Sequence, residues 1–118
     1  MEFSEILKRL REEHGYTQEK LASVIHVSKN SVSHYERNIS MPEIDVLIGI
    51  AEVFDVSIDY LLGRTEFNLS HEKLKKVATK NLSVGQLVEK ISNLDQSHKL
   101  DLYKALYYIE RDNRQNKS

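Results

Sequence analysis

The sequence predicts an all-helical protein, on the basis of its composition and its hydrophobic pattern. Its 118 residues include one proline and four glycines, the two residue types that interrupt helices most strongly. Apolar residues recur three and four residues apart along most of the chain, which is the spacing of one helix face. A chain of this length buries roughly two thirds of its unfolded surface and can form a core without cross-links.

The first two helices are expected over residues 2–14 and 18–25. The apolar positions of the first follow an i, i+3, i+4, i+7 spacing, and Gly15 supplies the left-handed residue that ends many helices. Thr17 is a suitable N-cap for the second helix, because its hydroxyl can accept a hydrogen bond from a free backbone N–H.

Three further short helices complete an expected N-terminal domain. Ser28 can cap a third helix that runs to about Arg37, and Pro42 favours the first turn of a fourth over about 43–54. Ser57 can cap a fifth. The residues expected to be buried on the fourth helix are Ile44, Leu47, Ile50, Ala51 and Phe54.

The second half of the chain is expected to be a separate helical segment. We place the first domain at residues 1–65, a linker at 66–70, the helical segment at 71–112 and a frayed polar tail at 113–118.

Three helical stretches are expected in this segment. Ser70 opens the first, which includes Leu74, Val77 and Ala78. The letters SVGQ at 83–86 form a capping-box signature for the second, and Asp95 can cap the longest helix, over about 96–111.

Charge is distributed unevenly along the chain. Residues 1–66 carry 7 Lys/Arg and 12 Asp/Glu, a net charge of −5, whereas residues 67–118 carry 10 and 6, a net charge of +4. The stretch 20–35 nevertheless contains no acidic residue and includes Lys20 and Lys29. Any nucleic-acid site in the first half must therefore be a local patch.

Several other classes of protein are not expected. The absence of cysteine excludes disulfides and thiolate metal sites, and no apolar run suggests a signal peptide or a membrane span, so we expect a cytoplasmic protein. HEKLK at 71–75 lacks the second histidine of a zinc-protease helix, and no Gly-rich phosphate loop is present. We therefore expect no catalysis, metal or cofactor.

Residues 18–37 have the pattern of a helix-turn-helix. Val32 and Tyr35 must point inward, which leaves short polar side chains on the opposite face of the third helix. Such a helix fits the DNA major groove, which is about 12 Å wide. There Lys29 can donate to guanine and Asn30 can bond adenine, while Ser33 and His34 can bond neighbouring base edges.

The sequence here resembles the Cro and phage-repressor-like helix-turn-helix family, also called the xenobiotic-response-element type. The resemblance lies in GYTQEKLASVIHVSKNSVSHYERN and PEIDVLIGIAEVFDVSIDYLLG and covers about residues 3–65. It implies a five-helix, lambda-repressor-like DNA-binding domain in a transcriptional regulator from a bacterium, a phage or a mobile element.

The resemblance also implies roles for individual residues. Lys29, Asn30 and His34 match base-reading positions, with Ser33 at the edge of that surface. A solvated face remains the alternative for these residues. The residues expected to contact phosphates are Gln18, Ser28, Arg37, Asn38 and Ser40.

Three of these expectations concern residues that support or directly follow the third helix. Arg11 and Glu36 match a structural charge pair that ties the first helix to the third. Gln18 matches a residue that both contacts a phosphate and buttresses the reading helix, although it could be an ordinary polar residue at a helix start. Asn38 replaces the family's frequent glycine, and asparagine also tolerates the left-handed conformation.

The last helix is too apolar to be a solvated tail. It could fold back on its neighbours as a small satellite core, or it could dock against the same helix of a second subunit, and we favour a homodimer. The residues expected at the dimer contact are Leu100, Leu102, Tyr103, Leu106, Tyr107 and Ile109.

These expectations converge on a repressor that binds double-stranded DNA as a homodimer at an inverted repeat, because two half-sites roughly double the binding free energy of one module. The alternative is a protein-interaction module, an antitoxin or an antagonist, whose C-terminal helices bind a regulatory protein partner.

Overall fold

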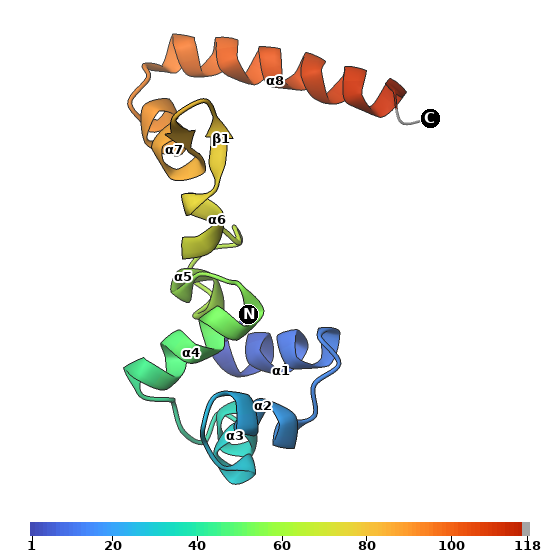
Figure 1. Cartoon of the computed structure of the whole chain (residues 1–118), viewed down its shortest axis with the longest axis vertical. Coiled ribbons are helices and arrows are strands. Elements are labelled where there is room, and N and C mark those ends of the chain that lie inside the picture. The colour runs from blue at the N-terminus through green and yellow to red at the C-terminus, as the bar shows by residue number, and fades with distance from the viewer. Residues whose placement is uncertain (117–118) are drawn as a thin grey trace. The chain divides into compact units, whose positions relative to one another are not determined.

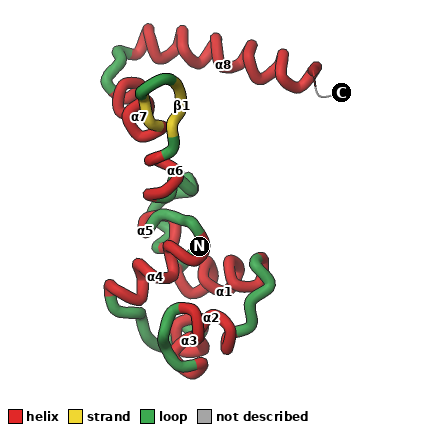
Figure 2. Tube along the Cα trace, in the orientation of Figure 1, coloured by secondary structure: helices red, strands yellow, loops and turns green. Residues whose placement is uncertain are grey.

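The computed structural model describes residues 1–116 (Figure 1). Helices dominate it, and one short hairpin between α6 and α7 interrupts them (Figure 2). The predicted all-α class is therefore confirmed. The chain divides into two compact units, Met1–Leu74 and the residues from Lys75 onward.

The N-terminal unit contains the five predicted helices and most of a sixth. Helix α3 is the predicted reading helix, and only a short turn separates it from α2. The helices are α1 (Phe3–Glu13), α2 (Gln18–Val24), α3 (Lys29–Glu36), α4 (Ile44–Phe54), α5 (Ile58–Leu61) and α6 (His71–Lys75).

Local capping explains where these helices begin. The hydroxyl of Thr17 accepts from the backbone N–H of Lys20 at 3.0 Å, and the hydroxyl of Ser57 accepts from that of Tyr60 at 3.0 Å. Gly15 has a φ of 71°, as its place after α1 predicts. Both cap predictions and the glycine prediction are confirmed.

The core of this unit lies between the helices that carry the reading surface. Leu7 on α1, Leu21 on α2 and Val32 on α3 are fully buried, together with Ile50 on α4 and Leu61 on α5. One side chain from each of the five helices thus meets in a single cluster, which fixes α2 and α3 against the rest of the unit.

One predicted core residue is wrong. Ile44, expected to be buried on the fourth helix, is 78% exposed, whereas Ile50, Ala51 and Phe54 are buried as predicted. Ile44 is the first residue of α4, directly after the N-cap Glu43. Pro42 accordingly precedes the helix by two residues instead of occupying its first turn.

The segment after α5 is held against the N-terminal unit. Ser70 is buried, and its hydroxyl donates to Asp55 Oδ1 at 2.6 Å. Lys73 Nζ donates to the Asp55 carbonyl at 3.3 Å. The two units consequently divide after Leu74, which lies beyond the linker predicted at 66–70.

A β-hairpin replaces part of the predicted helical stretch after Ser70. Strand β1 (Val77–Thr79) pairs antiparallel with β2 (Leu82–Ser83), so the helical prediction for Val77 and Ala78 is wrong. The β-branched side chains of Val77 and Thr79 favour a strand, and Lys80 turns the chain with a φ of 45°.

Two helices follow the hairpin, α7 (Val84–Ser92) and α8 (Gln96–Asn116). The predicted capping box at α7 is confirmed, since Ser83 and Gln86 bond each other's backbone N–H at 3.1 and 2.8 Å. Asp95 caps α8 by accepting from the His98 N–H at 2.9 Å. Of the tail predicted to fray from residue 113, residues 113–116 form the end of α8, and the last two residues lie outside the described part.

The C-terminal unit buries none of its described residues. Between 75 and 116 every side chain is exposed or partly exposed, so α8 has not folded back into a satellite core. The six residues predicted for the dimer contact are between 40% and 65% exposed: Leu100, Leu102, Tyr103, Leu106, Tyr107 and Ile109.

Candidate nucleic-acid interface

The turn between α2 and α3 orients the reading helix. His26 adopts a left-handed φ of 61°, and the Val27 N–H then donates to the Ala22 carbonyl at 3.0 Å. A non-glycine residue in this conformation costs about 1–2 kcal/mol. Sequence reasoning missed this feature, because histidine gives only a weak signal for the left-handed region.

The first turn of α3 presents unoccupied polar side chains. Lys29 and Asn30 are exposed, and neither side chain makes a hydrogen bond or ion pair within residues 1–116. On the opposite face Val32 is fully buried and Tyr35 is 8% exposed. The inward and outward faces of α3 are thus the ones that the sequence predicts.

Ser28 is engaged by the helix that it begins. Its hydroxyl accepts from the Ser31 N–H at 3.1 Å and lies 2.9 Å from the Ser31 hydroxyl. The predicted N-cap is confirmed. A phosphate contact from Ser28 would have to share a hydroxyl that already caps α3.

Ser33 and Arg37 form a pair one helical turn apart. Arg37 Nε donates to Ser33 Oγ at 3.1 Å, which aligns the guanidinium with the outward face of α3. Ser33 and His34 are half-buried, whereas Arg37 is exposed. A residue predicted to read bases and one predicted to contact phosphates are therefore in direct contact.

The chain leaves α3 through a left-handed residue. Asn38 has a φ of 59°, as expected where the family often has glycine, and the Ile39 N–H donates to the His34 carbonyl at 2.9 Å. Asn38 and Ser40 are both exposed in this loop. Their side chains are free to reach a ligand beside the C-terminal end of α3.

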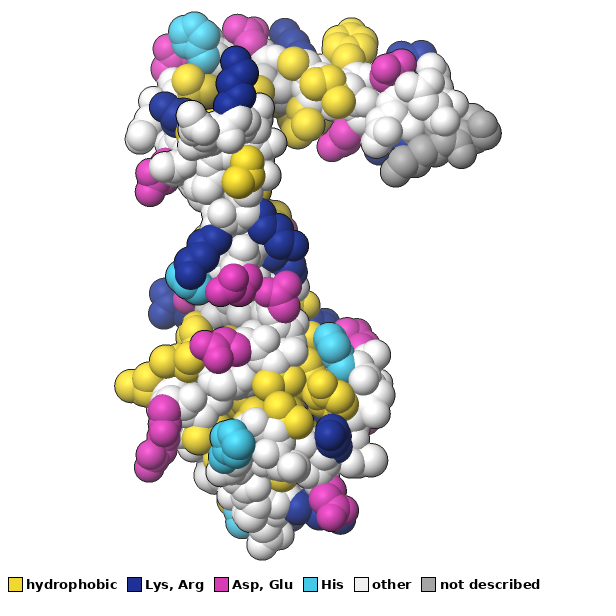
Figure 3. All heavy atoms as spheres, viewed as in Figure 1, with side chains coloured by type: hydrophobic (Ala, Val, Ile, Leu, Met, Phe, Trp, Pro, Cys, Tyr) yellow, Lys and Arg dark blue, Asp and Glu magenta, His cyan; other side chains and the backbone are white. Residues whose placement is uncertain are grey.

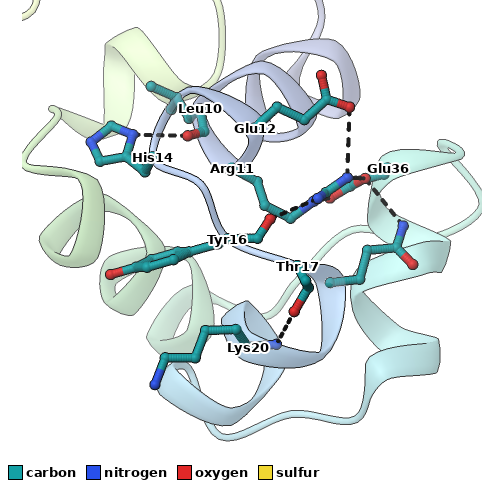
Figure 4. Close-up of polar contacts among 9 residues, drawn as sticks. Leu10, Arg11, Glu12, His14, Tyr16, Thr17, Lys20 and Glu36 are labelled. Carbon is teal, nitrogen blue, oxygen red and sulfur yellow. Dashed lines mark hydrogen bonds and ion pairs between the residues drawn. The ribbon is translucent and has the colours of Figure 1, made fainter.

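A buried ion pair ties α1 to α3 (Figure 4). Arg11 Nε and Nη2 donate to the two carboxylate oxygens of Glu36 at 2.6 and 3.0 Å, and Nη1 donates to the Tyr16 carbonyl at 2.8 Å. The side chains of Arg11 and Glu36 are only 12% and 3% exposed. The hydrogen bond to Glu36 raises the pKa of Arg11 above its ordinary value, against the opposing effect of burial.

Gln18 joins this pair from α2. Its Nε2 donates to Glu36 Oε1 at 3.2 Å, so Glu36 links all three helices around the reading surface. The amide keeps a second N–H with which it can donate to an acceptor such as a phosphate oxygen. The family resemblance implied that Gln18 buttresses the reading helix, but it did not identify Glu36 as the partner, because residues 18 positions apart give no periodic signal.

Metal ligands and membrane-spanning helices are two further features that bear on function. No group of three or more His, Asp or Glu side chains within residues 1–116 is arranged to hold a metal ion. Over the same residues, no helix is both long and apolar enough to cross a bilayer.

Comparison with known proteins identifies the fold around this surface. Residues 7–61 match the model of the Helix-turn-helix family. Most of the N-terminal unit is thus similar to the helix-turn-helix family. The match covers all of α2 and α3, and also Arg11 and Glu36, so the resemblance predicted from the sequence is confirmed.

Curated relatives of this domain have regulatory names. The chain is 36% identical over 72 residues to the HTH-type transcriptional regulator ImmR of Bacillus subtilis. This alignment covers 61% of the chain and 57% of ImmR. The chain thus spans little more than half the length of that relative.

Two solved structures share the fold. A crystal structure of the P22 c2 repressor with a synthetic operator is 26% identical, with a TM-score of 0.51 over 52% of this chain and 94% of the repressor chain. A transcriptional regulator from Listeria innocua is 24% identical, with a TM-score of 0.53 over 93% of this chain and 94% of its own. The second likeness is one of fold.

Proposed function

We propose that this protein is a cytoplasmic repressor that binds an inverted-repeat operator as a homodimer and reads each half-site with α3. The observation that carries the proposal is the exposed and unoccupied polar start of α3, held in place by the Arg11–Glu36–Gln18 network. Most side chains on a solvated face lack such support from three helices.

The chemistry of α3 favours base reading at its first turn. Lys29 can donate to the O6 and N7 of guanine, and Asn30 can bond the N6 and N7 of adenine. Ser33 and His34 follow one turn later on the same face. The P22 c2 repressor, which shares this fold, was crystallised with an operator, and that supports the same use of the domain here.

Contacts with phosphates would set the position of α3 in the groove. Gln18 at the start of α2 and Arg37, Asn38 and Ser40 after α3 bracket the reading face on both sides. Such contacts fix register without reading sequence. Ser28 is a weaker candidate than the other four, since its hydroxyl caps α3.

The apolar surface of α8 supports the homodimer. Burying a leucine or isoleucine side chain contributes about 1.5–3 kcal/mol, and α8 exposes Leu100, Leu102, Leu106 and Ile109 together with its tyrosines. A two-fold partner would cover this surface and present two reading helices one turn of DNA apart, about 34–36 Å.

Sedimentation tests the dimer. Leu106→Glu should convert a dimer into a monomer because it places a charge in the contact, whereas Gln96→Glu at the start of α8 should not. The operator affinity of Leu106→Glu should fall by at least tenfold. A wild-type protein that stays monomeric, or a variant that stays dimeric, would contradict the proposal.

A second candidate function rests on the same exposed helix. The apolar face of α8 could bind a different protein, as in an antitoxin or an antagonist, with DNA binding secondary. The two candidates differ in the isolated protein: a self-associating α8 gives a stable symmetric dimer, whereas a partner-binding α8 leaves a monomer. The sedimentation experiment above distinguishes them.

A further inference from the structure

The outer face of α4 carries an apolar surface that DNA reading does not use. Ile44 and Ile48, one helical turn apart, are 78% and 45% exposed. Two hollows meet at Ile48, one of about 720 Å³ and one of about 600 Å³. The larger extends to the exposed Phe67 and Leu69, and we call the two together the α4 groove.

Carboxylates surround this apolar floor. No lysine or arginine lines either hollow among the described residues. Figure 3 shows hydrophobic side chains that reach the surface at the left edge of the N-terminal unit, with acidic side chains beside them. The acidic lining residues are Glu43, Asp45, Glu52, Asp55, Asp59 and Glu72.

Cations of the same unit neutralise only part of this charge. Asp59 lies 3.2 Å from Arg64 Nε, and Asp55 lies 3.9 Å from Lys73 Nζ. Glu43 and Glu52 are exposed and form no ion pair with any residue that the structure describes. The groove therefore combines exposed apolar side chains with a rim of uncompensated negative charge, and an apolar patch with a polar rim is typical of an interaction site.

We propose that the α4 groove binds an amphipathic helix of a partner protein whose apolar residues are flanked by lysine or arginine. Helices dock in apolar grooves through side chains at i, i+3 or i+4, and i+7, and the groove offers Ile44, Ile48 and Phe67 to such a row. The carboxylates of its rim would pair with the flanking cations and set the orientation.

Two other occupants fit less well. DNA is excluded, because carboxylates repel phosphates. Helix α8 of a second copy carries four basic residues but also three carboxylates, Asp101, Glu110 and Asp112, so its net charge is only +1. The proposal goes beyond the repressor function, since it concerns a partner that contacts the regulator away from α3.

Selection from a displayed library of random 16-residue peptides tests the proposal on the full chain. We expect enrichment of helical peptides with apolar residues at i, i+3 or i+4, and i+7 and a net positive charge. A synthetic copy of an enriched peptide is then titrated by fluorescence anisotropy. Failure to enrich any sequence, or enrichment of acidic or unpatterned peptides, would overturn the proposal.

Three variants show where the peptide binds. The pair Glu43→Lys/Glu52→Lys and the pair Ile44→Ser/Ile48→Ser change only exposed positions and should each weaken binding at least tenfold. Glu19→Lys, an exposed carboxylate at the start of α2, is the matched control and should change it less than twofold. Equal binding by all the proteins, or enrichment of peptides that match residues 96–116, would also overturn the proposal. Circular dichroism verifies that each variant is folded.

Discussion

The ion pair between Arg11 and Glu36 allows a quantitative test of how the reading helix is supported. Glu36→Ala removes both hydrogen bonds that the Arg11 guanidinium, 12% exposed, makes to a carboxylate, and leaves only the Glu12 carboxylate 3.8 Å from Nη2. Removing one partner of a buried pair costs about 3–5 kcal/mol, because the other charge stays buried. Arg11 keeps its bond to the Tyr16 carbonyl, so we predict a loss near the lower end, about 3 kcal/mol.

Replacement of both residues gives a different result. Two unit charges about 4 Å apart attract each other by about 4 kcal/mol at an effective dielectric constant of 20, but both have been removed from water. This desolvation offsets most of the attraction. We therefore predict that the free energy of unfolding of Arg11→Met/Glu36→Leu lies within about 1 kcal/mol of the wild-type value.

Urea unfolding of the wild-type protein, Arg11→Met, Glu36→Leu and the double variant, followed by circular dichroism at one protein concentration, measures this cycle, and Glu36→Ala is unfolded beside them. Because the pKa of Arg11 is raised above its ordinary value, its contribution to stability is complete at lower pH and is lost only as pH rises through the folded-state value, far above neutrality. A single pH near 7 is therefore sufficient. A coupled, buried ion pair would be refuted if each single substitution lowered the free energy of unfolding by under about 1 kcal/mol and if the two losses added within about 0.5 kcal/mol in the double variant.

Three further predictions concern single residues. His26→Gly should raise the free energy of unfolding by about 1 kcal/mol in a urea titration, because glycine adopts a φ of 61° without strain. Ser28→Ala should lower it by about 1 kcal/mol in the same titration, because α3 loses its cap. Hydrogen bonds from His98 and Ser97 lower the pKa of Asp95 below 3.8. The stability that Asp95 gives to α8 is therefore present above pH 3.8 and lost as pH falls through its folded-state pKa. Circular dichroism should record this loss as a fall in helicity in the wild-type protein and no such fall in Asp95→Ala.

Sequence reasoning predicted what local chemistry determines. Thr17, Ser28 and Ser57 cap the helices that they were expected to cap, since each hydroxyl needs only a backbone N–H three residues away. The inward direction of Val32 and Tyr35 followed from helical spacing alone. The structure also joins Arg11 to Glu36, a contact that only the family resemblance implied.

The features that sequence reasoning missed depend on contacts between distant residues or on weak local preferences. Ser70 is fixed by Asp55, 15 positions earlier, and no periodicity marks such a bond. Val77 and Ala78 were assigned to a helix because a short apolar run fits a helix or a strand equally well. Ile44 has the helical spacing of a core residue, but it is the first residue of α4 and its side chain remains exposed.

Selection of bound DNA from a random duplex pool tests directly whether α3 reads an operator, with affinity for the selected site measured across a salt series. We predict an inverted repeat and a steep fall of affinity with salt. Lys29→Ala and Asn30→Ala should each lose about 1–3 kcal/mol of binding free energy and relax the base preference. Gln18→Ala and Arg37→Ala should weaken binding to all sequences alike. A folded protein that selects no sequence, or one that binds its selected site equally well after all four substitutions, would contradict the account.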